Sequence, residues 1–236
     1  MSSVTDRLSA NLAAVRERIV AAARTSGRPP EAVRLVAATK YVSAEITRAI
    51  VAAGCHDLGE SRPQTLWAKA ESLTALPEVR WHLIGHLQRN KVERTLPVTA
   101  LIHSVDSLRL AQAIDEAAAR QGRPAAILLE VNVSGEPAKH GFTPADLEHQ
   151  LPAIAALPNL ELHGLMAMAG REELDHDPRR EFALLRELRE RLASRVPAPE
   201  RFRELSMGMS GDFEQAILEG ATLVRVGSAL FEGIDA

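Results

Sequence analysis

Glu204-Leu-Ser-Met-Gly-Met-Ser-Gly-Asp212 and Leu223-Val-Arg-Val-Gly-Ser228 are two short stretches in which apolar residues give way to glycine and small polar residues. Each pattern predicts a buried strand whose carboxyl end leaves backbone N–H groups uncovered. A helix that begins there adds the positive end of its dipole. Two adjacent strand ends of this kind predict an anion site, most simply a phosphate site. Lys40 ends a similar strand far upstream.

The composition is that of a globular protein with a sizeable core. The 236 residues are 46% apolar and 25% charged, and this length suits one domain of barrel size or two small ones. A net charge of −3 gives no support for nucleic-acid binding, which usually shows as a basic excess. Cys55 is the single cysteine, so no internal disulfide forms, and we expect it to be a small buried side chain in a reducing compartment. No stretch has the pattern of a signal peptide or membrane span, so we expect a cytoplasmic protein with no membrane partner.

Strands and helices alternate along the chain after a leading helix at Thr5–Ala23, whose apolar residues recur on one face. Predicted strands are Val33–Ala38, His56–Gly59, Val79–Ile84, Thr99–His103, Pro124–Val133, Leu160–Met166 and two short ones around Leu205 and Leu223. Predicted helices are Ser43–Ala53, Arg62–Leu76, a short one through Arg94, one capped by Asp106 and ending near Gly122, one opened by Thr143-Pro144, Pro178–Ala193 and Gly211–Glu219.

Apolar strands that alternate with amphipathic helices indicate a parallel sheet covered by helices. Eight such units in a chain of this length predict a single (β/α)8 TIM barrel with an extra N-terminal helix, one domain over residues 1–236. The alternative is an open, doubly wound sheet, which no glycine-rich dinucleotide turn after the first strand supports.

Function in such a barrel lies at the carboxyl ends of the strands, and these ends are unusually polar here. The barrel fold therefore predicts that a lysine, an arginine, several hydroxyls and several glycines meet at one mouth. The predicted ends are Thr39-Lys40, Gly59-Glu60-Ser61, Gly85-His86, His103-Ser104, Asn132, Met166-Ala-Met168, Ser206-Met-Gly208 and Arg225-Val-Gly-Ser228.

Lys40 is a candidate for covalent chemistry with an aldehyde. Inside a barrel mouth its ammonium would be partly desolvated and close to Arg225, and both effects lower the pKa of an amine. The neutral amine attacks an aldehyde to form a Schiff base. The alternative is a surface lysine with a packed stem.

Ser210, Gly227 and Ser228 are the candidate phosphate contacts, although a serine before a helix and a glycine after a strand are also routine structural features. The pair of strand ends is the stronger signal, because late strand ends often hold phosphate in barrels. Arg225 lies two residues before Gly227 on the same strand face. A fixed cation facing a pyridine nitrogen keeps that nitrogen unprotonated. Together these groups describe a site for pyridoxal 5′-phosphate (PLP).

The sequence resembles the YggS/PROSC family of pyridoxal phosphate homeostasis proteins along its whole length. The two most specific blocks are Trp81–Lys91 and Ser206–Ser210. The other matching pieces are Ala37–Tyr41, Gly59-Glu60 with Gln64, His103–Asp106, Glu130–Asn132 with Lys139 and Gly141-Phe142, Gly164–Met168 and Arg225–Ser228.

This resemblance implies an alanine racemase-like, fold-type III PLP barrel without a second domain, and PLP as the cofactor. By resemblance, Lys40 is the Schiff-base lysine, and Arg225 is the partner of the pyridine nitrogen. The remaining implied cofactor contacts are Ser210, Gly227 and Ser228 at the phosphate, Ser206 and Met209 along the cofactor, and His86 and Asn132 at the mouth. One departure from the family is Ser61-Arg62, where Asn-Tyr is usual.

Two functions follow from this interpretation. A binding protein would hold PLP and release it to apoenzymes in the cell, with no metal, no catalytic residue and a monomeric chain. An enzyme such as an amino-acid racemase would need a second base, which related racemases take from another domain, and here only His86 or His103 could serve. We therefore expect the binding protein.

Overall fold

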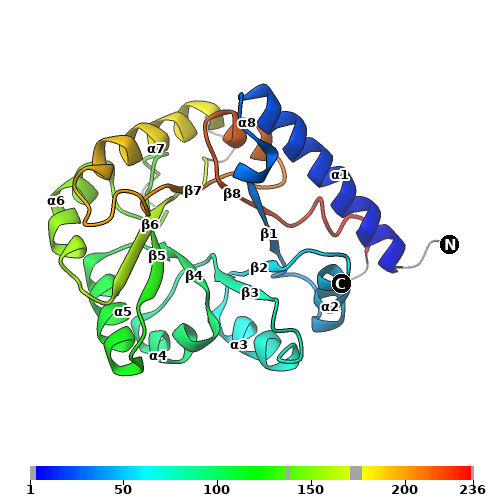
Figure 1. Cartoon of the computed structure of the whole chain (residues 1–236), viewed down its shortest axis with the longest axis horizontal. Coiled ribbons are helices and arrows are strands. Elements are labelled where there is room, and N and C mark those ends of the chain that lie inside the picture. The colour runs from blue at the N-terminus through cyan, green and yellow to red at the C-terminus, as the bar shows by residue number, and fades with distance from the viewer. Residues whose placement is uncertain (1–3, 137–138, 171–176, 235–236) are drawn as a thin grey trace.

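The computed structural model describes residues 4–136, 139–170 and 177–234. Eight parallel strands form a closed barrel in chain order, because β1 pairs with both β2 and β8 (Figure 1). This confirms the predicted (β/α)8 barrel and excludes the open sheet. The strands are β1 (Arg34–Ala38), β2 (Asp57–Glu60), β3 (Arg80–Leu83), β4 (Leu101–Val105), β5 (Ala125–Glu130), β6 (Leu160–Met166), β7 (Glu204–Ser206) and β8 (Leu223–Val226).

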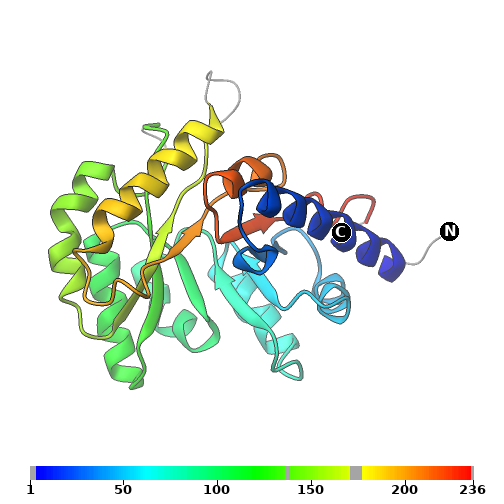
Figure 2. The same ribbon diagram turned by 45° about the horizontal axis from the view of Figure 1, so that its top comes forward.

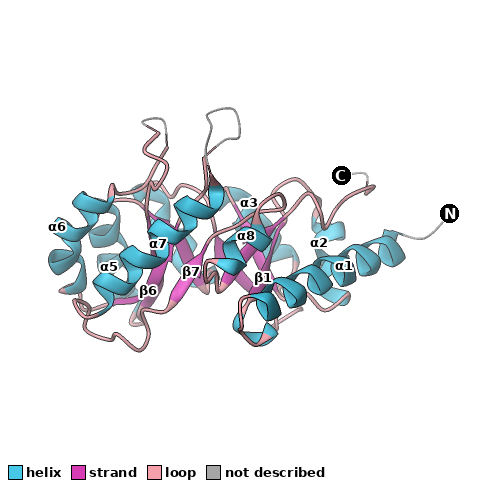
Figure 3. Cartoon of the chain, turned by 90° about the horizontal axis from the view of Figure 1, so that it is seen from above, coloured by secondary structure: helices cyan, strands magenta, loops and turns pink. Residues whose placement is uncertain are grey.

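Helices surround the strands on the outside, as the view from above shows (Figure 3). Capping side chains start several of them: Ser43 accepts from the Ile46 amide, and Thr143 accepts from the Asp146 amide. The helices are α1 (Val4–Thr25), α2 (Ala44–Ala52), α3 (Pro63–Ser72), α4 (Val92–Thr95), α5 (Leu108–Gln121), α6 (Pro144–Ala155), α7 (Pro178–Ala193) and α8 (Phe213–Leu218), with 3₁₀ turns η1 (Pro30–Ala32), η2 (Arg89–Lys91) and η3 (Leu96–Val98).

The leading helix α1 completes the outer ring beside α8, in the place that a helix after β8 would occupy (Figures 1 and 2). Its predicted apolar face is buried. The Asn11 side chain donates to the carbonyls of Leu230 and Glu232, both at 3.0 Å, and so ties the segment after β8 to α1. The buried face consists of Leu8, Leu12, Val15, Ile19, Ala22 and Ala23.

Apolar side chains form two layers. The larger layer lies between the sheet and the helices and includes the buried faces of α1, α5 and α7. A smaller cluster joins residues of strands that are not neighbours in the sheet, so it can only lie inside the barrel. This inner cluster consists of Val36, Leu101, Leu128, Met166 and Leu223. Strand alternation therefore identifies which side chains point into the barrel.

Several predicted boundaries were wrong: the strand predicted over Pro124–Val133 ends at Glu130, and the helix predicted over Arg62–Leu76 ends at Ser72. Three others involve polar side chains or helix length. Ser107, not Asp106, caps α5, because the Ser107 hydroxyl accepts from the Leu110 amide. Strand β4 starts at Leu101 rather than Thr99, whose hydroxyl instead donates to the carbonyls of Thr95 and Leu96. Helix α8 starts at Phe213, not at Gly211, and its six residues make a weaker dipole than the longer helix that the sequence predicts.

A buried ion pair fixes the end of β1 immediately before Lys40. The Lys69 ammonium of α3 lies 2.6 Å from Glu60 Oε1 and donates to the Thr39 carbonyl at 2.7 Å. The Thr39 hydroxyl donates to the same Glu60 oxygen at 2.6 Å. All three side chains are almost completely buried, so the backbone on the amino side of Lys40 is held from two directions.

Cys55 is buried, and this burial raises the pKa of its thiol to about 11. The prediction of a small buried side chain is confirmed.

Within the described residues, no helix combines the length and apolar character that crossing a membrane requires.

Candidate functional site

Polar side chains lie inside the barrel directly beyond the inner apolar cluster. Alternation along each strand places them on the same face as Leu101, Leu128 and Leu223, two residues closer to the carboxyl end. The inner wall at the mouth is therefore charged and polar although its residues are buried. The side chains placed there in this way are those of His103, Glu130 and Arg225.

Lys40 and the Gly227 turn lie at the same end of two neighbouring strands. Strands β1 and β8 pair with Ala37 opposite Val226, and a Cβ atom on Gly227 would lie only 3.2 Å from the Ala38 carbonyl oxygen. Lys40 is half-buried, with its Nζ 4.9 Å from the centre of the Tyr41 ring. Within the described residues its amine makes no hydrogen bond or ion pair, so it is available for a ligand.

Ser210 joins the two glycine-rich stretches. Its hydroxyl oxygen accepts from the amides of Gly227 at 3.1 Å and Ala229 at 3.4 Å. Across the described part of the chain, no hydrogen bond uses the amides of Ser210, Gly211 or Ser228. This turn therefore offers several N–H groups to an anion, and the residues present fit a phosphate group.

Gly208 gives this turn its shape. Its φ is +91°, and a Cβ atom would lie 2.7 Å from the Ala216 side chain, so only glycine fits. Asp212 lies beside the turn, where its Oδ1 accepts from the Met209 amide at 2.5 Å. Burial raises the pKa of Asp212, while the Met209 amide and the charge of Arg225 act in the opposite direction.

Arg225 is buried, and its guanidinium is held at two points. Nη1 donates to Ser206 Oγ at 2.6 Å, and Nη2 donates to the Ala167 carbonyl at 2.9 Å. Burial lowers the pKa of Arg225 to about 10, against the opposing charges of Glu130 and Asp212, so it stays protonated at neutral pH. No hydrogen bond within the described residues uses Nε, so the Nε–H is among the donors left for a ligand atom.

Glu130 is a buried acid that interacts electrostatically with Arg225. Burial and the charge of Asp106 raise the pKa of Glu130 to about 7, while Arg225 acts in the opposite direction. The carboxyl group therefore changes charge near neutral pH, close to the fixed arginine.

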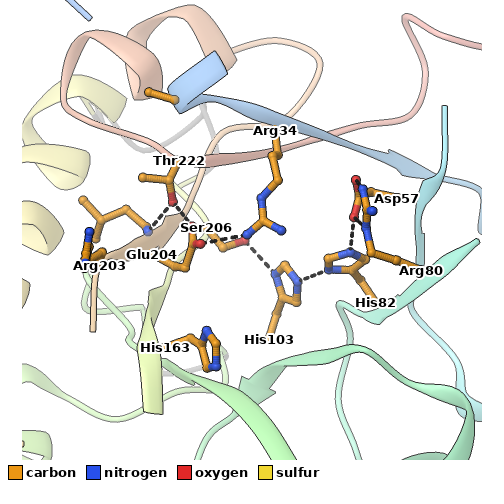
Figure 4. A network of polar contacts seen from close by, with 12 residues as sticks. Arg34, Asp57, Arg80, His82, His103, His163, Arg203, Glu204, Ser206 and Thr222 are labelled. Carbon is orange, nitrogen blue, oxygen red and sulfur yellow. Dashed lines mark hydrogen bonds and ion pairs between the residues drawn. The ribbon is translucent and has the colours of Figure 1, made fainter. Parts of the chain in front are cut away.

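A chain of hydrogen bonds runs through the barrel from Arg225 to Asp57. Figure 4 shows its part from Ser206 to Asp57. The Ser206 hydroxyl lies 2.7 Å from His103 Nδ1. His103 Nε2 lies 2.8 Å from His82 Nδ1, and His82 Nε2 lies 2.9 Å from Asp57 Oδ1. Arg80 donates to both oxygens of Asp57 at 2.8 and 2.6 Å.

With both imidazoles neutral, the two ends of this chain are consistent with one direction of hydrogen bonding. Arginine can only donate, so Ser206 accepts from Arg225, and the Asp57 carboxylate accepts from His82 Nε2. His82 Nδ1 then accepts from His103 Nε2, and His103 Nδ1 accepts from the Ser206 O–H. Burial lowers the pKa of His103 well below its usual range, and the positive charges of Arg225 and Arg34 act in the same direction. A neutral His103 is what this arrangement needs.

The Asp57 end of the chain is ionised. Burial alone would raise the pKa of Asp57, but the hydrogen bonds of Arg80 and His82 and the charge of Arg80 hold it well below its usual range. The sequence analysis missed this chain. The sequence did contain a signal for it. Polar residues alternate with apolar ones in these strands, whereas the strands of a parallel sheet are usually apolar on both faces.

His103→Leu should destabilise the protein by about 1–3 kcal/mol, because it leaves the buried Ser206 O–H without an acceptor and the buried His82 Nδ1 without a partner. The free energy of unfolding from urea denaturation measures this loss. His149→Leu, on the exposed face of α6, is the control and should change it by less than about 0.5 kcal/mol. Equal effects of the two substitutions would contradict the inferred network.

The predicted site residues fall into two groups. Lys40, Ser206, Met209, Ser210, Arg225, Gly227 and Ser228 all lie at or just beyond the carboxyl ends of β1, β7 and β8, which are neighbours in the barrel. Ser206 is buried between His103 and Arg225, Met209 is 40% exposed and Ser228 is exposed.

His86 and Asn132 form the second group, on the β3 and β5 side of the mouth. His86 is exposed, and its Nδ1 lies 3.1 Å from Asp106 Oδ2. The Asn132 side chain holds its own loop, because it donates to the Glu136 carbonyl and accepts from the Gly135 amide. Ser61, the first residue of the Ser61-Arg62 departure, lies against the loop after β3. A Cβ on Gly85 in that loop would lie 2.4 Å from the Ser61 carbonyl oxygen.

The fold and the mouth define a class of protein: a parallel eight-stranded barrel with unbonded backbone amides in the turns after β7 and β8 and, among the described residues, a lysine without a polar partner after β1. A family model for the alanine racemase N-terminal domain matches residues 10–234. A pyridoxal phosphate homeostasis protein of Pseudomonas aeruginosa is 41% identical over 95% of each chain. The chain belongs to the family of pyridoxal phosphate homeostasis proteins.

Solved structures agree with this assignment. A protein from Bifidobacterium adolescentis described as unknown is 41% identical, with a TM-score of 0.90 over 98% of this chain and 97% of that one. PipY from Synechococcus elongatus, solved with PLP bound, is 38% identical, with a TM-score of 0.82 over 95% of this chain and 99% of that one. The predicted family and fold are confirmed.

Proposed function

We propose that this protein binds PLP at the barrel mouth on Lys40 and serves intracellular PLP homeostasis as a binding protein. The observation that carries the proposal is the pairing of β1 with β8, which brings the free Lys40 amine to the same rim as the turn formed by Ser210 and Gly227. The PLP-bound structure of PipY supports it.

Each residue has a defined part in this proposal. Ser210, Gly227 and Ser228 would hold the phosphate, with the unbonded amides of Ser210 and Ser228 as donors and Gly227, which has no side chain, leaving room for the phosphate in the turn. Arg225 would present its free Nε–H to the ring nitrogen. When bound, the aldehyde of PLP forms a reversible Schiff base with a lysine amine, and Lys40 is the amine at this rim. Ser206 and Met209 would lie along the cofactor.

Binding rather than turnover is the better fit to these side chains. A racemase needs a second base, and both nitrogens of His103 are already used inside the barrel. Tyr41 is 79% exposed and adjacent to Lys40 in the chain. A charged Arg225 at the ring nitrogen also weakens the ring as an electron sink. The proposal takes residues 1–236 as one monomeric domain and PLP-dependent apoenzymes as recipients.

The phosphate turn predicts a preference for PLP over pyridoxal, which has the same aldehyde and no phosphate. We expect pyridoxal to bind at least about tenfold more weakly, a difference of about 1.4 kcal/mol. Equilibrium dialysis of the cofactor-free protein with each compound measures this ratio. Equal affinities would show that the turn formed by Ser210 and Gly227 does not hold the ligand.

The absence of turnover has its own test. PLP-loaded protein kept with L-alanine in deuterated water should show no exchange of the α-proton above the rate with free PLP, because the charged Arg225 at the ring nitrogen disfavours the carbanion that this exchange requires. Proton NMR follows the α-proton signal. Exchange that is fast and is lost in His86→Ala would favour the racemase alternative and identify the base.

A further inference from the structure

Three loops at the barrel mouth bring two imidazoles to one carboxylate. His86 follows β3, Asp106 follows β4 and His140 lies in the loop after β5. Asp106 Oδ2 lies 3.1 Å from His86 Nδ1 and 3.8 Å from His140 Nδ1, and one potential ligand atom from each of the three residues lies within 4.8 Å of the other two. This group is on the opposite side of the mouth from Lys40 and the Ser210 turn, and the PLP proposal does not use His140 or Asp106.

A hydrogen bond to Asp106 accounts for the position of His86, at 3.1 Å, but not for that of His140, at 3.8 Å. The two histidine rings are stacked, with centroids 4.5 Å apart and planes at 17°, and both Nδ1 atoms approach the same oxygen. Both rings therefore present the same nitrogen to one carboxylate oxygen. The lone pair of a neutral imidazole nitrogen is the form in which histidine binds metals.

The distances suit a small cation. Ligand atoms about 2.0–2.2 Å from a tetrahedral zinc ion lie about 3.3 Å from each other. The observed separations of 3.1 and 3.8 Å bracket this value. The histidine side chains are 43% and 61% exposed, so their rotation costs little packing. Asp106 is only 12% exposed, and its other oxygen, Oδ1, accepts from the Ser107 hydroxyl, which orients Oδ2 toward the histidines.

We propose that His86, Asp106 and His140 form a binding site for a divalent transition metal ion such as Zn²⁺. Two imidazole nitrogens and one carboxylate oxygen favour late first-row ions over Mg²⁺ and Ca²⁺, which prefer oxygen ligands throughout. Three protein ligands leave a fourth position open to the solvent-filled pocket of about 490 Å³ beside His86. Arg89 and Arg109 line this pocket and limit the affinity through their charge. The bound ion would join the loops after β3, β4 and β5.

Titration with Co²⁺, followed by its visible d–d absorption, tests this proposal on the untagged full-length protein after removal of metals and PLP. We expect saturable binding of one ion per chain, displaced by Zn²⁺. His86→Ala and His140→Ala should each weaken Co²⁺ binding about 10- to 100-fold, while circular dichroism shows that the fold is kept.

His163→Ala is the matched control, because His163 also pairs with a carboxylate, Glu161 at 3.4 Å, but without a second histidine. It should leave Co²⁺ binding unchanged. No saturable binding, or equal loss in all three variants, would overturn the proposal. Since PLP takes no part in the titration, its outcome does not depend on the proposed PLP function.

Discussion

Lys40→Ala removes the absorption band of protein-bound PLP. Lys40 is the amine at the rim shared by β1 and β8, and within the described residues it makes no hydrogen bond or ion pair that would compete with a ligand. Alanine has no amine, so the covalent bond cannot form and only the phosphate contacts remain. We expect complete loss of the near-visible band after gel filtration, measured by absorption spectroscopy on protein loaded with PLP.

Lys91→Ala is the matched control for this experiment. Lys91 lies at the end of η2, and its side chain has no hydrogen bond or ion pair with the described residues, so its removal changes the number of lysines without changing the rim. The control should keep the full band. A Lys40→Ala protein that keeps the band would remove Lys40 from the proposed role, whatever the affinity of the protein for PLP.

Lys69→Met should cost about 3–5 kcal/mol of stability. The substitution keeps a similar length but leaves Glu60 as a buried charge without its ion-pair partner. It also removes the donor to the Thr39 carbonyl, directly before Lys40. Urea denaturation monitored by circular dichroism gives the free energy of unfolding.

A second variant separates the lost ion pair from simple changes in packing. Lys69→Met combined with Glu60→Leu removes both charges and should recover part of the stability that Lys69→Met loses. Lys91→Met, at a partly exposed position, should change stability by less than about 0.5 kcal/mol. A loss below about 1 kcal/mol in Lys69→Met would show that the buried pair does not hold the end of β1.

Elements with strong local signals could be predicted from the sequence alone. Leu160–Met166 and Pro178–Ala193 have the predicted boundaries, since one is an apolar run and the other has a proline at its first position and an apolar stripe. Boundaries set by competing side chains were wrong. At α5 and α8 the side chains of Asp106 and Asp212 bind elsewhere in the loops, to His86 and to the Met209 amide, instead of capping.

The mouth was predictable only in part. Parallel strands place their carboxyl ends together, so Lys40, Ser210 and Arg225 could be assigned to one rim from the strand pattern. The neighbours inside the barrel could not, because contact between Ser206, His103 and His82 depends on the order and register of three strands. The same limit applies to His86, which the resemblance placed at the cofactor and which the structure places against Asp106 and His140.

Borohydride reduction of the PLP-loaded protein, followed by peptide mapping with mass spectrometry, tests the central claim most directly. Reduction makes the bond between the lysine and the aldehyde permanent, so the modified residue can be read from the fragment masses. We predict one pyridoxyl group per chain, on Lys40. Modification spread over Lys69, Lys91, Lys139 or the terminal amine, or absent altogether, would contradict the claim that Lys40 and the Ser210 turn hold one ligand.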